Sequence, residues 1–143
     1  MLSFTRRIFA LILLSAFFGN ANETIVFSFE LQNNGGKITV FESESKLGYT
    51  LVDKDGKVEF ECPARDKANG GECADRDNFK FSLDDKKEFL NFKNKKSTYL
   101  IYDNGEDYGI RVMTGIIMQY WKGANKNGSL KNINALENVK LVK

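Results

Sequence analysis

Short segments of alternating apolar and polar residues, separated by turn-forming residues, dominate the chain. The first, residues 25–31, places four apolar side chains on one face of a strand: Ile25, Phe27, Phe29 and Leu31. Similar segments lie at 37–41, 49–52, 57–61, 79–83, 88–92, 98–102, 109–113, 116–121 and 139–142. Glycine- and asparagine-containing stretches such as 33–36 and 53–56 separate them as turns. This pattern predicts an all-β fold, either a small antiparallel β-barrel or a sandwich.

Helical patterns are few. Residues 83–90 are compatible with one helical turn, and residues 130–138 with a short helix or an irregular segment. Neither a composition shift nor an internal repeat marks a domain boundary. Residues 22–143 are therefore predicted to form a single β-rich domain.

The first 21 residues have the layout of an export signal. Arg6 and Arg7 precede an unbroken apolar run, Ile8–Phe18, and Gly19-Asn-Ala21 supplies the small residues that signal peptidase requires. The run is too short to be a transmembrane anchor, which needs about 20 residues. We expect cleavage after Ala21, a secreted or periplasmic protein and no stable membrane insertion after cleavage.

Charge and composition exclude several functions. The chain has 21 basic and 19 acidic residues, and loss of Arg6 and Arg7 with the signal balances the two signs. A neutral protein is not expected to bind nucleic acid. The absence of histidine removes the commonest general base and metal ligand. No catalytic residue, metal or cofactor is predicted; an enzyme that uses carboxylates alone is the alternative. Asn22 and Asn127 fit the N-glycosylation sequon.

The two cysteines, Cys62 and Cys73, flank a polar stretch that contains the only proline, Pro63. In an oxidising compartment an even number of cysteines favours a disulfide over a metal site. We expect a Cys62–Cys73 bridge that closes a surface loop.

The most distinctive stretch is 103–130. It opens with Asn104-Gly105, a strong tight-turn signal between two strands. Further on, Tyr120-Trp-Lys-Gly123 predicts an aromatic strand that ends in a turn and projects one ammonium group, that of Lys122, from a rigid support. The turn and strand signals by themselves favour two hairpins of a β-meander.

This stretch also resembles the bacterial periplasmic and membrane-bound inhibitors of C-type lysozyme. Their motif, Ser-Gly-x-x-Tyr followed by an aromatic strand and Trp-x-Lys-Gly, is similar to Asn104-Gly105-Glu-Asp-Tyr108 and to Tyr120-Trp-Lys122-Gly123. The gaps between these residues are longer in this chain than in the family. The family's disulfide joins the two ends of the domain, whereas Cys62 and Cys73 are close in sequence.

The resemblance implies a small antiparallel barrel that pushes a loop into the lysozyme cleft. Lys122 would then form charge-assisted hydrogen bonds with the two catalytic carboxylates, and Asn104 would assist through its amide. The predicted function is a non-catalytic secreted binding protein with a protein partner, a C-type lysozyme. The alternative is a barrel that binds an apolar ligand or an envelope partner. An exposed Lys122 beside the 103–108 turn favours the first, and a deep apolar cavity favours the second.

Overall fold

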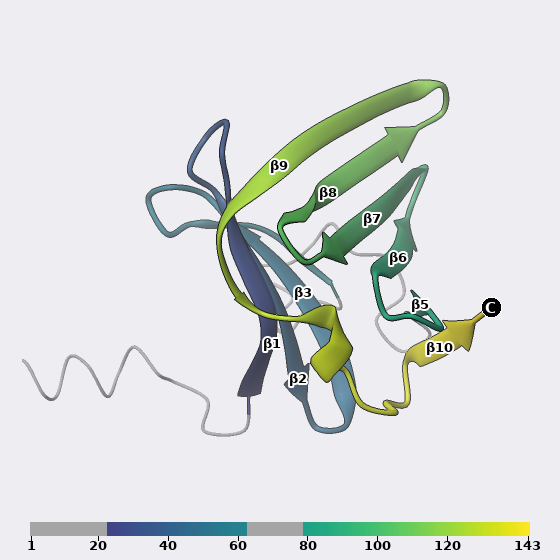
Figure 1. Cartoon of the computed structure of the whole chain (residues 1–143). Coiled ribbons are helices and arrows are strands. Elements are labelled where there is room, and N and C mark those ends of the chain that lie inside the picture. Colours follow the sequence, from purple (N-terminus) through teal and green to yellow (C-terminus); the bar gives the residue numbers. More distant parts are fainter. Residues whose placement is uncertain (1–22, 63–78) are drawn as a thin grey trace, which may run out of the picture.

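Ten strands form one curled sheet, an open half-barrel, in the computed structural model, which describes residues 23–62 and 79–143 (Figure 1). The strands are β1 Glu23–Leu31, β2 Lys37–Ser43, β3 Lys46–Val52, β4 Val58–Cys62, β5 Phe81–Asp84, β6 Phe89–Asn94, β7 Ser97–Asn104, β8 Asp107–Thr114, β9 Ile117–Gly128 and β10 Val139–Val142. The only helical element in the described residues is a 3₁₀ turn, η1 Leu130–Asn132. Each segment predicted as a strand lies on one of these ten, and the all-β class is confirmed.

The strand order is β10-β5-β6-β7-β8-β9-β1-β2-β3-β4. Neighbours are antiparallel except β10 and β5, which are parallel. β9 joins the two halves of the sheet, because Ile117–Lys122 pair with β8 whereas Gly123–Gly128 pair with β1. In Figure 1 this long strand arches from the tip of the β8–β9 hairpin down to η1. The geometry of any site on β9 is therefore fixed by both halves.

The core fills the concave side of the curled sheet. It consists mainly of phenylalanine and aliphatic side chains contributed by both halves, among them Phe27, Phe29, Ile38, Leu47, Phe60, Phe81, Leu90, Phe92, Ile101 and Ile110. Aromatic rings join the halves: Phe60 stacks on Tyr99 at 5.3 Å between ring centroids, and Tyr99 stacks on Phe92 at 4.8 Å. Tyr49 is enclosed among them, and burial raises its pKa well above the ordinary value.

The alternation predicted for the first strand is wrong at its start. A β-bulge between Ile25 and Phe27 shifts the register against β2. As a result Val26 is buried while Ile25 is 55% exposed. From Phe27 to Leu31 the predicted face is the buried one.

The one-turn helix considered at 83–90 is also wrong. Asp84 ends β5, and its carboxylate accepts hydrogen bonds from the backbone N–H groups of Glu88 and Phe89, both at 2.7 Å. This side-chain contact closes a tight turn into β6 instead of a helix. The segment 130–138, in contrast, is the short 3₁₀ turn and irregular chain that was expected.

Cys62 is fully buried at the end of β4, whereas Cys73 lies outside the described residues. The disulfide therefore stays a prediction, and so do the signal peptide and its cleavage after Ala21. No helix in 23–62 or 79–143 is long and apolar enough to cross a membrane.

Candidate functional site

The β7–β8 hairpin positions the first group of predicted site residues. Asn104 pairs with Asp107, so Gly105 and Glu106 form the two-residue turn. Gly105 has a φ of 80°, a left-handed conformation that glycine adopts without steric cost. The tight turn predicted from Asn104-Gly105 is confirmed, and Asn104 through Asp107 are all exposed.

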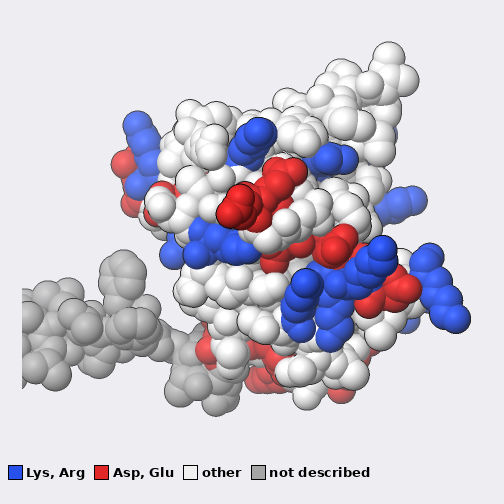
Figure 2. Space-filling view, viewed as in Figure 1, with Lys and Arg blue, Asp and Glu red and all other residues white. Residues whose placement is uncertain are grey.

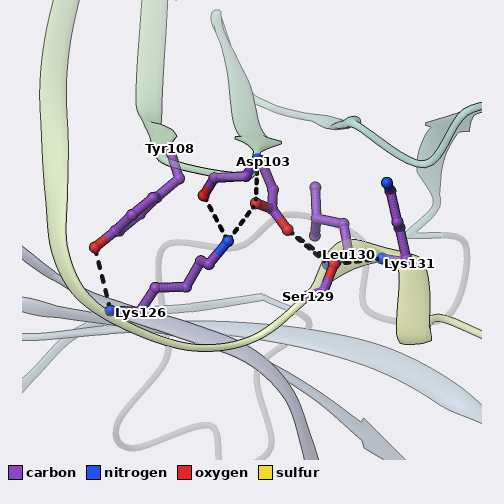
Figure 3. A network of polar contacts seen from close by, with 7 residues as sticks. Asp103, Tyr108, Lys126, Ser129, Leu130 and Lys131 are labelled. Atoms are coloured by element: carbon purple, nitrogen blue, oxygen red, sulfur yellow. Dashed lines mark hydrogen bonds and ion pairs between the residues drawn. The ribbon is translucent and has the colours of Figure 1, made fainter.

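A buried carboxylate, Asp103, holds this turn to the end of β9 (Figure 3). Asp103 is 4% exposed, and its Oδ1 lies 3.1 Å from Nζ of Lys126. Its Oδ2 accepts hydrogen bonds from the hydroxyl of Ser129 at 2.9 Å and from the N–H of Leu130 at 3.3 Å. Because the carboxylate is charged, hydrogen-bonded and paired, it meets the conditions for burial of a charge. We call Asp103, Lys126 and Ser129 the Asp103 network.

The same lysine also fixes the turn directly. Nζ of Lys126 donates to the carbonyl of Gly105 at 2.6 Å and lies 5.3 Å from the centre of the Tyr108 ring. The backbone N–H of Lys126 donates to the Tyr108 hydroxyl at 3.2 Å. Lys126 therefore has structural partners for its charge and its backbone.

A β-bulge in β9 explains how Lys126 reaches the concave side. Between the pairs Ser28–Asn127 and Glu30–Ala124 the register shifts, so that β9 contains one residue more than β1. Asn125 adopts a φ of 53° there, and its side chain donates to Glu30 at 3.0 Å. The extra residue changes the face on which the following side chain lies.

The turn predicted after Tyr120-Trp-Lys-Gly123 is wrong, because β9 continues to Gly128. Gly123 serves close packing instead: a Cβ there would lie 2.5 Å from the Tyr108 ring and 2.7 Å from Phe29. The two rings meet edge to face at 5.7 Å over the glycine. A glycine at this position thus allows the strand to pass the rings, rather than ending it.

Lys122 is exposed and lies beside the β7–β8 turn. It pairs with Gly109 of β8, and its carbonyl accepts a hydrogen bond from the N–H of Gln32 at 3.0 Å. In the part of the chain that the structure describes, its ammonium group has neither an ion pair nor a hydrogen bond, although Lys126, four residues along the strand, has both. The backbone of Lys122 is fixed and its charge is free.

A surface recess of about 360 Å³ collects most of the predicted partner-binding residues. Its lining is Gln32, Glu106, Asp107, Tyr108, Tyr120, Lys122 and Gly123. Two carboxylates, those of Glu106 and Asp107, thus share the recess with one ammonium. Asn104 and Gly105 lie on the exposed turn next to it. The predicted residues are close together, but Tyr108 and Gly123 are explained by packing alone.

Arg111 and Tyr102 lie on the convex face of the sheet, next to the recess, and neither was predicted as a site residue from the sequence. Arg111 donates to the Tyr120 hydroxyl at 3.1 Å, and its guanidinium lies 4.7 Å from the Tyr120 ring and 5.1 Å from the Tyr102 ring. Tyr102 is buried beneath them, and burial, with the nearby Tyr120 hydroxyl adding to it, raises the pKa of Tyr102 to about 12. The arginine opposite an aromatic residue in the hairpin was the available signal.

A second depression, in the hollow of the half-barrel, measures about 280 Å³. Mostly apolar side chains from both halves line it, including Ile38, Tyr49, Phe60, Ile110, Val112 and Trp121. Ligand pockets commonly measure about 300–1,000 Å³, so this hollow lies just below the usual range. It fits a short apolar group better than a drug-sized molecule.

Metal binding has no support in the described residues, where no three histidine, cysteine or acidic side chains come together. Searches of protein-family models, of curated proteins and of solved structures found no match to this chain.

Proposed function

We propose that this protein is a secreted, non-catalytic binding protein that inhibits a C-type lysozyme by presenting Lys122 to the carboxylates of the enzyme's cleft. The observation that supports the proposal most is the ammonium of Lys122, which lies on a strand beside the β7–β8 turn and has no partner among residues 23–62 and 79–143. Binding of this ammonium to another molecule breaks none of the contacts within the described part of the chain. The fixed backbone of Lys122 also reduces the entropy lost on binding.

The chemistry matches the expected target. A glycosidase cleft contains two carboxylates, one acting as acid and one as nucleophile. An ammonium placed between them forms charge-assisted hydrogen bonds and blocks the substrate. The exposed amide of Asn104 on the neighbouring turn supplies a second, neutral donor.

The two carboxylates of the recess act against such a partner. Glu106 and Asp107 lie near Lys122 and would face the acidic cleft. Like charges across an interface weaken association. Replacing both with their amides is therefore expected to strengthen inhibition, provided that the partner's binding cleft is acidic.

The test is lysis of a bacterial cell-wall suspension by several C-type lysozymes in the presence of excess protein. Lys122→Met is expected to lose about 2–5 kcal/mol of binding, because the enzyme's carboxylates are then buried without a counter-charge. Lys131→Met, at another exposed lysine, is the matched control and should inhibit like the wild type. Uninhibited lysis by the wild-type protein would refute the proposal.

The hollow of the half-barrel supports a second candidate function, binding of a small apolar ligand. Its lining is mostly apolar and includes Trp121, the only tryptophan in the chain. Tryptophan emission should therefore shift when a short-chain fatty acid or a similar apolar probe binds. Val112→Asp, which puts a charge at a half-buried position of the hollow, should abolish that shift, whereas Lys122→Met should not change it.

A further inference from the structure

The tip of the β8–β9 hairpin is apolar and projects from the sheet. Residues 112–121 contain no charged side chain. Its large side chains face solvent: Met113 is 45% exposed, Ile116 103%, Ile117 64% and Met118 58%. Figure 2 shows this projection at the upper right without a charged side chain on it. Contiguous apolar surface of this kind usually marks a contact with another molecule or a membrane.

The neighbouring turn is basic. Asn94 pairs with Ser97, so Lys95 and Lys96 form the β6–β7 turn, and Lys93 precedes it. All three lysines are exposed, and none has an ion pair or hydrogen bond to the described residues. Residues 89–102 include no acidic residue. Among the described residues, nothing therefore compensates the three positive charges of this turn.

The basic turn and the apolar tip lie side by side on one edge of the sheet. Ser97 pairs with Thr114, and their hydroxyl oxygens are 2.6 Å apart. Gly115 and Ile116 form the adjacent β8–β9 turn, since Thr114 pairs with Ile117. Aromatic side chains follow behind the tip, with Tyr120 48% exposed. Proteins that bind a lipid–water interface place apolar side chains among the lipids and keep cationic and aromatic side chains at the headgroups. The tip, the lysines and the aromatic rings follow this order.

We propose that this edge docks on an anionic phospholipid bilayer, with Ile116 and Ile117 among the acyl chains and the three lysines at the phosphates. The charge of the lysine turn selects the lipid, because an anionic surface attracts clustered basic residues. A neutral apolar partner would use the tip and leave the lysines without a role. The proposal is independent of the proposed function, which rests on Lys122 and Asn104, away from the tip.

The open edge of β9 limits the depth of docking. In the described part of the chain, β1 reaches β9 only at Gly123, so residues 117–121 have a strand neighbour on the β8 side alone. Backbone groups without partners are not tolerated in hydrocarbon. Two or three residues at about 3.3 Å each can therefore enter, a depth of roughly 7–10 Å. Docking is peripheral and reversible, within one leaflet.

The first test is co-sedimentation of the full mature chain with vesicles of phosphatidylcholine alone or mixed with phosphatidylglycerol. The wild type is expected to bind the mixed vesicles and to dissociate at high salt. Lys93→Gln, Lys95→Gln and Lys96→Gln together should weaken binding about a hundredfold, since each lysine contributes about fivefold. The matched control, Lys54→Gln with Lys57→Gln at the β3–β4 turn, should bind like the wild type.

The second test measures depth. Ile116→Trp in a Trp121→Phe background puts the sole tryptophan at the tip, where lipids brominated on the acyl chains should quench it strongly. Ile116→Asp with Ile117→Asp should lower vesicle binding more than tenfold, with an unchanged unfolding midpoint as evidence of folding. Equal binding to uncharged vesicles, or an unquenched tip tryptophan in sedimented protein, would overturn the proposal. The proposal would also be overturned if the wild type did not bind vesicles and formed a dimer that Ile117→Asp dissociates.

Discussion

At one end of the β8–β9 hairpin, a buried carboxylate, an ammonium and several backbone groups hold the strands to the rest of the molecule. At the other end, the large side chains of the tip lie in solvent. Strands β8 and β9 run through both ends, but at the first end β9 pairs with β1, and side chains join it to Asp103 of β7 and to the β7–β8 turn. The difference lies in the contacts of the side chains: Asp103 is 4% exposed, whereas Ile116 is 103% exposed.

The side chains at the first end stabilise the fold, whereas those at the tip are available for recognition. The Asp103 network stabilises the fold and positions the recess beside it, because the β7–β8 turn and the end of β9 meet there. The tip stabilises nothing that the structure shows, so its apolar residues are free to contact another surface. Substitutions should therefore have opposite signatures at the two ends.

The largest effect is expected from Asp103→Ala. The change removes the counter-charge of Lys126 and leaves the N–H of Leu130 without its acceptor. Because Lys126 is 26% exposed and can be solvated, the loss of this pair and of the hydrogen bonds of the carboxylate should cost about 2–4 kcal/mol. Urea unfolding measures the loss, and Asp107→Ala, at an exposed carboxylate of the same hairpin, should cost less than about 0.5 kcal/mol. Equal losses would show that the network does not stabilise this end.

Gly123→Ala should follow, with a loss of about 1–3 kcal/mol. The new methyl group would overlap the rings of Tyr108 and Phe29 in a packed region. Gly105→Ala, in open space but at a φ of 80°, is expected to cost about 1 kcal/mol by backbone strain alone. Thermal unfolding of both variants checks whether the ring contact outweighs the strain.

The two lysines of β9 should differ in their contribution to stability. Lys126→Met leaves Asp103 without its counter-charge but with its other hydrogen bonds, so about 2 kcal/mol of stability should be lost. Lys122→Met should change the free energy of unfolding by less than about 0.5 kcal/mol, because this ammonium has no partner in the described residues. Similar losses for the two would contradict the assignment of separate roles.

Tyr102, on β7 beside this hairpin, should give a pH-dependent effect. Its pKa in the folded protein is raised to about 12, from 10.0, so folding favours the protonated form. This contribution is fully present below about pH 10 and is lost as the pH rises toward 12. Tyr49 acts in the same direction. Urea unfolding at pH 9 and pH 11.5 should show a smaller decrease in Tyr102→Phe than in the wild type.

The smallest effect is expected at the tip, from Ile116→Ser. An isoleucine that is fully exposed buries no area on folding, and its replacement should alter the free energy of unfolding by less than about 0.5 kcal/mol. A loss above 1 kcal/mol would mean that the tip packs against something in the isolated protein.

The strands were predictable because their signal is local. The alternation of apolar and polar residues predicted the strand segments. Asn104-Gly105 and Asp53-Lys-Asp-Gly56 predicted two of the turns, because each turn type depends on the conformation of its own residues. The failures at Ile25 and at Gly123 have a different cause. A bulge depends on the partner strand, and the glycine depends on two rings from other strands.

The candidate site was predictable only in part. Asn104 and Lys122 were singled out from short motifs, and Asn104 lies on the turn whose Glu106 and Asp107 line the recess together with Lys122. Lys126 was not distinguished from the other lysines near the C-terminus. Its role depends on a bulge in β9 and on a carboxylate 23 residues earlier in the sequence. Neither the bulge nor the contact with the carboxylate can be predicted from the spacing of residues in the sequence.

The shared strand β9 also has a consequence for the kinetics of folding. Hairpins such as β2–β3 and β7–β8 can form from local contacts, but the contact between Gln32 and Gly123 spans 91 residues. The two halves therefore cannot be joined until β9 has been synthesised and has found β1. Such long-range pairing slows folding, commonly to milliseconds or seconds. During this time the apolar face of β1–β4 has no partner, so β9 is the strand whose arrival decides between folding and aggregation.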